Sequence, residues 1–585
     1  MTAVPVTMCT AFQATIARSP EAVAVRTAGD GVTMTFREWG VRARELAAGF
    51  AALGVGRGSK VALMMTNRPE FYPVDTAVVH LGGVPFSMYN TSSPEQIHHL
   101  LSDSGATVVV CEAQFLPAIE KARAGTGVRF IVCIDGEGGM SLAELAAAAD
   151  PDFDFESCWR AVEPDDVLTL IYTSGTTGAP KGVQITHANM VAMVDASIRL
   201  ADATADERVL SFLPSAHIAD RWSALYLCRA LGNTVTTVAE RAGFAPGLAD
   251  CRPTLLGAVP QVWQKLRTGI EEKLGEATGV KAGLAKWAVG VGRRYSDARL
   301  DGDRIGPGLR ASHAIADRLV LSKVRAALGL DSLKVAISGA APVSTELLRW
   351  FNGFGIEVSD AWGMSEVSGM GSICPPGRFR LGTVGKPLDG LDVRIAEDGE
   401  VLVRGPLVMK GYLNRPEQTA EVIDADGWLH TGDIGDLDGD GYLRIVDRKK
   451  ELIINAGGKN MSPATIENWV KAFSPLVAQA IAVGDNRKYN VALIALDPDA
   501  VGGFAEKHGL AADPTLLATH PEMEIMISAA VSAANAKLSR VEQIKKFRIV
   551  PEFWQPGSEL LTPTMKPRRK PIHARYANLI EELYA

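Results

Sequence analysis

The sequence predicts an α/β protein with a large N-terminal domain of parallel-sheet layers and a small C-terminal α+β domain. Strands alternate with helices over residues 34–110, and short apolar runs return at similar spacing further along the chain. After Gly385, apolar and polar residues alternate instead. Alternating strands and helices form parallel sheets with crossover helices. A chain of 585 residues is also too long for one hydrophobic core.

The first helix and strands of this pattern have clear ends. Thr35 precedes a helical pattern that Gly54 stops. Residues 60–65 and 107–110 are apolar or β-branched, as buried strands are. Further strands of the parallel type are expected at 167–171, 208–213, 254–259 and 333–338. Because chemistry in such folds gathers at the carboxyl ends of the strands, the motifs that follow these runs are the ones to examine.

The chain beyond Gly385 predicts a small antiparallel β-subdomain and then a boundary. Residues 393–395, 400–404 and 442–446 alternate apolar and polar side chains, as strands with one wet face do. The charged run Asp447–Glu451 follows and is a linker candidate. We therefore expect an N-terminal domain at 1–446, a hinge linker at 447–451, and a small mobile α+β domain at 452–585.

Composition excludes several classes of protein. The chain is 47% hydrophobic and 22% charged, as ordinary globular enzymes are, and its net charge of −7 argues against a nucleic-acid partner. Seven scattered cysteines without a CxxC pair indicate reduced thiols and a cytoplasmic protein. The N-terminus lacks a signal-peptide pattern, and no apolar run reaches the roughly 18 residues of a spanning helix. Membrane contact would therefore be peripheral.

The most informative segment is residues 172–182, directly after the expected strand at 167–171. Glycines let the backbone approach an anion closely, hydroxyls add donors, and Lys181 adds a positive charge. This combination suits a polyphosphate. The segment lacks the Gly-Lys-Ser/Thr order of a Walker A loop, and a flexible surface turn is the alternative. The candidate phosphate-binding residues are Thr173, Ser174, Gly175, Thr176, Thr177, Gly178 and Lys181.

Five more motifs follow in the chain. A strand at 333–338 runs into the small-residue turn Gly339, Ala340 and Ala341, which leaves room for a flat ring against backbone. Next come an aromatic and acidic segment, a turn with a carboxylate, the start of the charged linker, and a lysine close to the C-terminus. Their sequences are Asp360-Ala361-Trp362-Gly363-Met364-Ser365-Glu366, Trp428-Leu429-His430-Thr431-Gly432-Asp433, Asp447-Arg448 and Leu561-Thr562-Pro563-Thr564-Met565-Lys566.

In this order, the motifs resemble the hallmarks of the adenylate-forming superfamily, which includes acyl-CoA synthetases, luciferases and peptide-synthetase adenylation domains. The resemblance covers essentially the whole chain, from Tyr172 to Lys566. Trp362 and Ser365 stand where the superfamily usually has Tyr and Thr, but both keep an aromatic face and a hydroxyl. The resemblance implies ATP and Mg²⁺ as cofactors.

The same resemblance implies a role for each site residue. Residues 173–178 and Lys181 would bind phosphates, and the nucleotide site would include Gly339, Ala340, Ala341, Asp360, Ala361, Trp362, Gly363, Ser365, Asp433 and Arg448. Within that site, Trp362 would stack on adenine and Asp433 and Arg448 would hold the ribose. Glu366 would hold Mg²⁺ through its carboxylate.

Three further residues would serve the reaction itself. Lys566 would be the adenylation lysine, whose ammonium offsets charge during attack on the α-phosphate. Lys450 falls on the hinge position of the superfamily. His217, in Phe212–Ile218, would line the carboxylate pocket. In isolation, Lys566 could belong to a basic tail and His217 could be an ordinary buried histidine.

The motifs around Trp362 and Lys566 look most like the long- and very-long-chain acyl-CoA synthetase branch. The long stretch 264–332 agrees, since shorter-acid ligases are more compact there. Gln261 stands where this branch often has Arg. The expected reaction converts a fatty acid and ATP to acyl-AMP and pyrophosphate, and then transfers the acyl group to CoA. The alternatives are a fatty acyl-AMP ligase that serves an acyl carrier protein, activation of another hydrophobic carboxylate, a luciferase-type oxygenase, and a non-catalytic nucleotide-binding homologue.

The basic stretch at residues 265–299 has two possible explanations. Lysines and arginines are interspersed with apolar residues there, and such a surface could contact anionic lipid. Glu271, Glu272 and Glu276 weaken that argument, and a solvated helical face is the more common explanation of a charge run.

Overall fold

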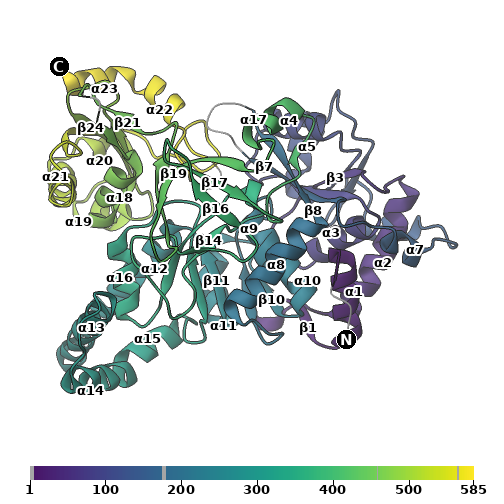
Figure 1. Ribbon diagram of the computed structural model, residues 1–585, viewed down its shortest axis with the longest axis horizontal. Coiled ribbons are helices and arrows are strands. Elements are labelled where there is room, and N and C mark those ends of the chain that lie inside the picture. Colours follow the sequence, from purple (N-terminus) through teal and green to yellow (C-terminus); the bar gives the residue numbers. More distant parts are fainter. Residues whose placement is uncertain (1–4, 174–178, 458, 563–564) are drawn as a thin grey trace.

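The protein consists of a large α/β body and a smaller C-terminal lobe (Figure 1). This computed structural model describes residues 5–173, 179–457, 459–562 and 565–585. Six sheets are present in these residues, and the expected combination of parallel α/β layers, an antiparallel subdomain and a small C-terminal lobe is confirmed.

A nine-stranded sheet runs through the body. Its six central strands, from β13 to β1, are parallel, whereas β14, β15 and β2 are antiparallel additions at the edges. In spatial order the strands are β15 (Lys386–Pro387), β14 (Ser372–Ile373), β13 (Val358–Trp362), β12 (Val335–Ser338), β11 (Leu255–Ala258), β9 (Arg208–Ser211), β10 (Thr234–Thr237), β1 (Val23–Thr27) and β2 (Thr33–Thr35).

A second, wholly parallel sheet contains the strands expected near residues 60 and 108. Its order is β4 (Val84–Ser87), β3 (Lys60–Met64), β5 (Val108–Cys111) and β6 (Phe130–Cys133). The first helix starts as the sequence predicts, because the Thr35 side chain accepts from the backbone N–H of Glu38 while the Glu38 carboxylate accepts from that of Thr35. The helices among these strands are α2 (Phe36–Ala52), α3 (Phe71–His80), α4 (Pro94–Ser104) and α5 (Leu116–Ala122).

The strand at the start of the expected phosphate loop does not belong to a parallel sheet, and the prediction for 167–171 is wrong in this respect. β7 (Val167–Thr173) pairs antiparallel with β8 (Lys181–Thr186), and β18 (Gly411–Tyr412) joins β8 on the other side. The physical reason is the length of the connection. A parallel pair needs a crossover of roughly a dozen residues or more, whereas β8 begins soon after β7 ends.

The antiparallel β-subdomain is confirmed. Its order is β16 (Asp392–Ile395), β17 (Glu400–Arg404), β19 (Leu429–Leu437) and β20 (Leu443–Arg448). β20 runs two residues beyond the strand end expected at 446, since Asp447 and Arg448 pair with Ile434 and Asp433. The chain then turns at 449–451 and enters the small lobe.

The small lobe has a hydrophobic core of its own. Two clusters of buried side chains lie on either side of its sheet, and all their members come from residues 453–584. The sheet is β23 (Val477–Val483), β24 (Asn490–Leu496) and β25 (Ile544–Ile549), with the short pair β21 (Ile453–Ile454) and β22 (Asn460–Met461) beside it. Its helices are α18 (Pro463–Phe473), α19 (Val501–Lys507), α20 (Pro514–Ala518), α21 (Pro521–Asn535), α22 (Arg569–Arg575) and α23 (Ala577–Tyr584).

The long stretch before β12 is helical, as the resemblance implied. α12 (Pro260–Gly275) lies beside the sheet, and α13 (Gly279–Leu300) and α14 (Pro307–Ala316) project from the body as a tower (Figure 1). A π-helical turn, Asp317–Leu321, and α15 (Ser322–Ala327) lead back to β12. The remaining helices are α1 (Met8–Arg18), α6 (Leu142–Ala147), α7 (Phe155–Arg160), α8 (His187–Ala201), α9 (Ile218–Asp220), α10 (Leu227–Leu231), α11 (Phe244–Cys251), α16 (Thr345–Gly353) and α17 (Pro416–Val422).

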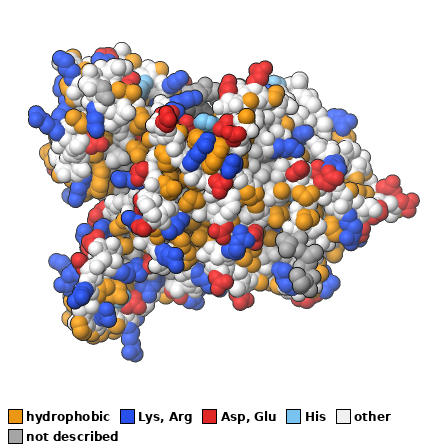
Figure 2. Space-filling view, viewed as in Figure 1, with side chains coloured by type: hydrophobic (Ala, Val, Ile, Leu, Met, Phe, Trp, Pro, Cys, Tyr) orange, Lys and Arg blue, Asp and Glu red, His pale blue; other side chains and the backbone are white. Residues whose placement is uncertain are grey.

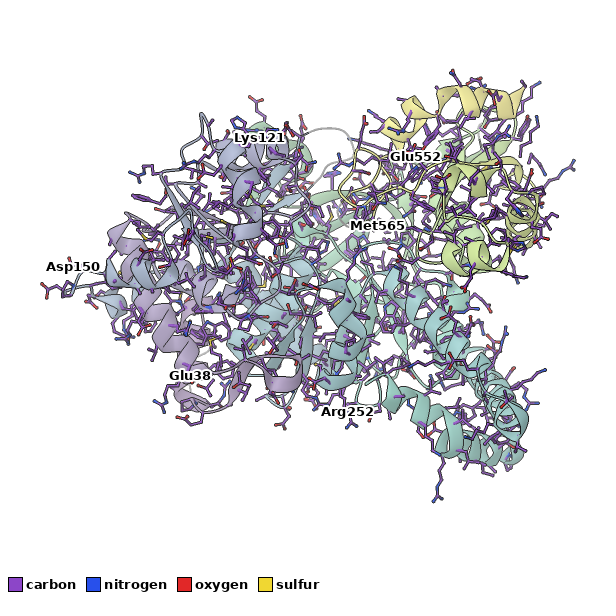
Figure 3. The ribbon with its side chains drawn as sticks, turned by 180° about the vertical axis from the view of Figure 1, so that it is seen from behind. Glu38, Lys121, Asp150, Arg252, Glu552 and Met565 are labelled. Carbon is purple, nitrogen blue, oxygen red and sulfur yellow. The ribbon has the colours of Figure 1, made fainter. Side chains whose placement is uncertain are left out.

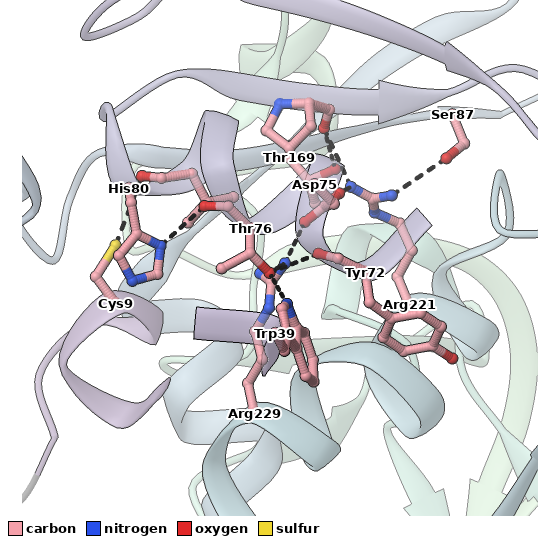
Figure 4. A network of polar contacts seen from close by, with 12 residues as sticks. Cys9, Trp39, Tyr72, Asp75, Thr76, His80, Ser87, Thr169, Arg221 and Arg229 are labelled. Atoms are coloured by element: carbon pink, nitrogen blue, oxygen red, sulfur yellow. Dashed lines mark hydrogen bonds and ion pairs between the residues drawn. The ribbon is translucent and has the colours of Figure 1, made fainter. Parts of the chain in front are cut away.

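The large body contains a fully buried cluster of charged side chains (Figure 4). The carboxylate of Asp75 on α3 accepts from Arg221 with one oxygen and from Arg229 with the other, the latter at 2.7 Å, and all three side chains are fully buried. Arg229 also donates to Thr76, which accepts from the Trp39 indole at 2.9 Å. The cluster therefore ties α2, α3 and α10 together.

The cluster holds two positive charges against one negative charge. Within the described residues, Nε of Arg221 and both Nε and Nη1 of Arg229 have no hydrogen-bond partner. The Arg229 guanidinium lies 5.3 Å from the Tyr226 ring centroid, a contact that offsets part of its desolvation. Arg221 is the first residue of a π-helix, Arg221–Tyr226, a rare form that occurs mostly at functional sites.

Replacing the shared carboxylate should destabilise the body strongly. In Asp75→Asn both arginines stay buried without a counter-charge, and breaking a buried pair in this way costs about 3–5 kcal/mol. Urea denaturation of this variant and of Asp436→Asn, an exposed acid on β19, measures the difference. Equal midpoints for the two variants would contradict the assigned importance of the cluster.

Candidate active site

One cavity of about 2880 Å³ lies between the large body and the small lobe. Met565, labelled in Figure 3, lies on its wall where the lobe faces the body. Every sequence-predicted site residue that the structure describes lines this cavity: Thr173, Lys181, His217, Gly339, Ala340, Ala341, Asp360, Ala361, Trp362, Gly363, Ser365, Glu366, Asp433, Arg448, Lys450 and Lys566. Ser174, Gly175, Thr176, Thr177 and Gly178 lie outside the described residues.

The parallel sheet brings several of these motifs together. β9, β11, β12 and β13 are parallel neighbours, so their carboxyl ends share one edge. The turn 339–341 follows β12, and Gly363–Glu366 follows β13. Ala340 adopts a left-handed conformation with φ +66°, which costs free energy for a residue with a Cβ and points to a constrained turn.

Trp362, Asp433 and Arg448 form a connected group at this edge. The Trp362 indole donates to Asp433 at 2.7 Å, and Nε of Arg448 lies 2.8 Å from the other oxygen of that carboxylate. Burial raises the pKa of Asp433, while Arg448 acts in the opposite direction. A carboxylate offers about four acceptor positions, so Asp433 keeps capacity for further donors such as vicinal hydroxyls.

Glu366 belongs to a second group, which includes a residue that the motifs did not indicate. The Tyr412 hydroxyl donates to the Glu366 carboxylate at 2.9 Å, and the Lys181 ammonium lies 4.8 Å from the centroid of the Tyr412 ring. Burial and the charge of Glu366 raise the pKa of Tyr412, so its hydroxyl stays a donor at neutral pH. Tyr412 therefore positions both the acid and the cation.

Lys566 reaches the cavity from the small lobe. Its backbone N–H donates to the Thr562 hydroxyl at 3.0 Å, and the preceding Met565 has a left-handed conformation with φ +66°. Burial and the nearby Arg448 lower the pKa of Lys566, whereas Asp433, Glu451 and Glu366 favour its charged form. The ammonium thus faces acids that belong mostly to the large body.

His217 lies in the cavity wall and also caps a helix. Its Nδ1 accepts from the backbone N–H of Ala219 at 3.1 Å, and burial with the charge of Lys566 lowers its pKa to about 4. The imidazole is therefore neutral at pH 7. Nearby, Asp220 accepts from Ser211 at 3.1 Å, and burial raises the pKa of Asp220 to about 7.

Lys450 is exposed and lies between two anchored residues. Lys449 contacts Asp398 at 2.5 Å and Glu400 at 3.0 Å, both in the β-subdomain. On the other side, Glu451 contacts Arg569 of the small lobe at 3.2 Å. One residue of the linker thus separates an anchor in the body from an anchor in the lobe.

Sequence reasoning missed Tyr412 and the contact between Asn67 and Asp220, because single polar residues outside a motif carry no signal for their partners. Asn67 donates to Ser211 and to the Leu213 carbonyl, both at 2.8 Å, and so braces the segment that leads to His217. Its position after the expected strand at 60–65 was the one available hint. Gln261, the departure from the long-chain pattern, lines the cavity as well.

The donor set fits a magnesium ion held together with a nucleotide. Among the described residues, no group of three or more His, Cys, Asp or Glu side chains forms a metal site by itself. Mg²⁺ commonly binds one or two carboxylates and completes its shell with substrate phosphates and water. Glu366, which accepts a hydrogen bond from Tyr412, is a carboxylate of this kind.

Comparison with known proteins identifies the family of the chain. The chain matches the AMP-binding enzyme family over residues 12–413 and the C-terminal domain of AMP-binding enzymes over residues 450–585. The chain belongs to the AMP-binding enzyme family. Its second match begins at Lys450, within the turn between the body and the small lobe.

Two relatives and one solved structure illustrate the similarity of this AMP-binding enzyme to others. FadD11 of Mycobacterium tuberculosis, whose provisional name is fatty-acid–CoA ligase, is 54% identical over 77% of this chain and 79% of its own. The long-chain-fatty-acid–CoA ligase FadD15 of the same organism is 38% identical over 95% and 93%. The adenylation domain of a carboxylate reductase from Mycobacterium chelonae shares the fold, with a TM-score of 0.74, 22% identity and coverage of 99% and 91%.

Removing the Tyr412 hydroxyl should weaken magnesium binding without removing the cation–ring contact. Tyr412→Phe keeps the ring beside Lys181 but releases Glu366, and losing a partner of a metal ligand typically costs about 10–100-fold in affinity. We expect the Mg²⁺ concentration for half-maximal ATP–pyrophosphate exchange to rise about tenfold. Tyr412→Leu, which loses both contacts, should be worse. An unchanged Mg²⁺ requirement in Tyr412→Phe would dissociate Tyr412 from the metal.

Proposed function

We propose that this AMP-binding enzyme is an AMP-forming long-chain fatty acid–CoA ligase. The observation that carries the proposal is that one cavity is lined both by the polar group Trp362, Asp433 and Arg448 and by a set of apolar side chains, which we call its apolar arm. These side chains come from β9, β11, α12 and the segments next to them, and they are Leu210, Phe212, Val238, Phe244, Leu256, Val262 and Leu266. An apolar arm suits an acyl chain, and the names of the relatives support this substrate class.

In the first step, a carboxylate oxygen of the fatty acid attacks the α-phosphorus of ATP and pyrophosphate leaves. Asp433 and Arg448 hold the ribose and Trp362 packs against the base, so the α-phosphate faces the strand edge. The Lys566 ammonium offsets the negative charge that gathers between the two anions, an electrostatic effect of the kind that dominates many enzymes. The neutral His217 keeps the carboxylate side of the site free of a competing cation.

Residues of the large body hold the remaining groups. Glu366 would hold Mg²⁺, which neutralises phosphate charge when it is bound. Ser365 and Lys181 contact phosphate oxygens. In the second step, the CoA sulfur attacks the acyl carbonyl carbon, AMP leaves with its phosphate oxygen, and the thiol proton is released to solvent. Lys566 has no part in this step and must withdraw so that the pantetheine arm can enter.

A fatty acyl-AMP ligase that transfers the acyl group to a carrier protein is the second candidate. It shares the first step and the same cavity residues, so only the acceptor separates the two. CoA is favoured as the acceptor because the relatives FadD15 and FadD11 are named as CoA ligases.

We also propose that the protein works in the cytoplasm in peripheral contact with a membrane. Its seven cysteines are unpaired. Over the part of the chain that the structure describes, no helix has both the length and the apolar character needed to cross a bilayer.

A panel of carboxylates with ATP, Mg²⁺ and CoA tests the function. We expect AMP and thioester to form fastest with long-chain acids. Lys566→Ala should lower pyrophosphate release by roughly 10²-fold or more, as loss of such a group usually does. Thioester formation from synthetic acyl-AMP and CoA should survive in the same variant.

The two half-reactions also separate the alternatives. Acyl-AMP that accumulates without thioester when CoA is present would favour a carrier-protein acceptor. Absence of ATP–pyrophosphate exchange with every acid would make the protein a non-catalytic homologue. Equal losses in both half-reactions of Lys566→Ala would show that this lysine is structural.

A substitution of Lys450 in the linker should affect the two half-reactions in the opposite way to Lys566→Ala. We propose that the boundary between the domains is the 447–451 linker and that Lys450 is its pivot. Lys450→Pro fixes φ near −65° and restricts the preceding residue, so the lobe should remain where Lys566 serves adenylation. Acyl-AMP should still form while its conversion to acyl-CoA slows sharply, as quench-flow measurement of bound adenylate would record.

Lys450→Ala is the matched control, because it removes the charge but leaves the backbone free. It should convert acyl-AMP at nearly the native rate. A proline variant that kept the full thioester rate would move the pivot elsewhere.

A further inference from the structure

The tower formed by α13, α14 and the following π-helical turn carries unusual surface side chains. Val280 is 89% exposed, Ile315 53%, Leu319 42% and Trp287 39%. Trp287 is the one tryptophan among the large exposed apolar side chains of the described residues. Val280, Trp287 and Arg294 are spaced by seven residues, so they share one face of α13. Among the described residues, Val280, Trp287, Ile315 and Leu319 belong to none of the hydrophobic clusters of the body.

Cations surround the exposed apolar side chains. Lysines and arginines of the tower are exposed and, within the described residues, make no ion pair: Lys281, Lys286, Arg294, Arg304, Arg310 and Arg318. Figure 2 shows blue and orange side chains together on this projecting part, at the lower left.

The acids of the tower are largely neutralised within the protein. Asp297 and Asp301 contact Arg349 at 3.1 and 2.7 Å, and Asp317 contacts Arg325 at 2.8 Å. Glu276 and Asp303 remain as exposed acids. The surface that the tower presents is therefore positive, although the whole chain carries a net charge of −7.

We propose that the tower docks the enzyme on an anionic membrane surface. Charge complementarity selects the partner: unpaired cations are attracted to anionic headgroups, and the interleaved Trp287, Val280 and Ile315 can enter the interfacial region, where aromatic and aliphatic side chains are favoured. An acidic protein would pair with the cations. It would not explain why the exposed apolar side chains stand at separate positions instead of forming one apolar patch.

The benefit of this docking rests on the proposed function, because it concerns how the ligase obtains its fatty-acid substrate. A long-chain acid partitions into bilayers, so a docked ligase draws its substrate from the surface where that substrate is concentrated. α13 follows α12 closely, and residues of α12 such as Val262 and Leu266 line the apolar arm of the cavity. The tower thus brings the acyl side of the enzyme towards the membrane.

Vesicle co-sedimentation tests the docking. Vesicles of phosphatidylcholine with an equal part of phosphatidylglycerol should bind the native protein, and pure phosphatidylcholine vesicles should bind it weakly. The triple variant Lys286→Glu, Arg294→Glu, Arg318→Glu should bind the anionic vesicles about tenfold or more weakly, because each surface cation contributes measurably to such binding. Trp287→Ser with Val280→Ser should lower binding at fixed charge.

A matched control carries the same change of charge on the small lobe. Lys537, Arg540 and Lys546 are exposed there, and Lys537→Glu, Arg540→Glu, Lys546→Glu should bind vesicles as the native protein does. Equal losses in both triple variants, or no binding of the native protein to anionic vesicles, would overturn the proposal. Capture by beads coated with polyglutamate without any vesicle binding would overturn it in favour of an acidic protein partner.

Activity measured with two forms of substrate separates docking from catalysis. The tower variant should turn over octanoate supplied in solution at the native rate, which also shows that it is folded. It should turn over oleate supplied in anionic vesicles several-fold more slowly. Vesicle binding by a native protein that lacks ligase activity would refute the proposed function and leave the docking intact.

Discussion

The two ion pairs of the Asp75 carboxylate, with Arg221 and Arg229, support the wall of the cavity that would bind the acyl chain. This carboxylate is the one acid between two fully buried arginines, and these arginines belong to the π-helix and to α10, which follow the cavity segment that contains His217. Water cannot screen the charges at this depth, so each arginine is held firmly by the shared acid. The excess positive charge costs free energy, and such costs are commonly found beside functional sites. Packing against Trp39 and Tyr226 limits that cost.

The polar end of the cavity follows a different principle, in which charges from two folding units meet. The large body supplies Asp433, Glu366 and Arg448 from its strands and the turns that follow them, whereas the small lobe supplies Lys566. The ammonium is desolvated, and the acids that keep it charged lie mainly across the gap. Catalytic competence is therefore a property of the relative position of the two parts and not of either part alone.

Much of this arrangement was predictable from the sequence, because the motifs are local. Trp362, Asp433 and Lys566 were identified although they are far apart in the chain, and the structure brings them to one cavity. The pairing direction of β7 was predicted wrongly, since an apolar run such as 167–171 does not encode its partner. Tyr412 and Asp75 were missed for the same reason: each has its role through a contact with a distant residue, Glu366 or Arg229, that no periodicity records. Burial of a lone polar residue becomes visible only when the tertiary structure is known.

The anchors on either side of Lys450 also bear on how such enzymes diversify. Lys449 is fixed by Asp398 and Glu400 in the body, and Glu451 by Arg569 in the lobe. A lobe taken from another family member would meet the body at this joint and at the ion pair between Lys265 on α12 and Asp499 of the lobe. Its surface away from the cavity could drift, provided that Lys566 and an arginine equivalent to Arg569 came with it. Recombination at this joint could thus exchange acceptor specificity while the adenylating body stayed the same.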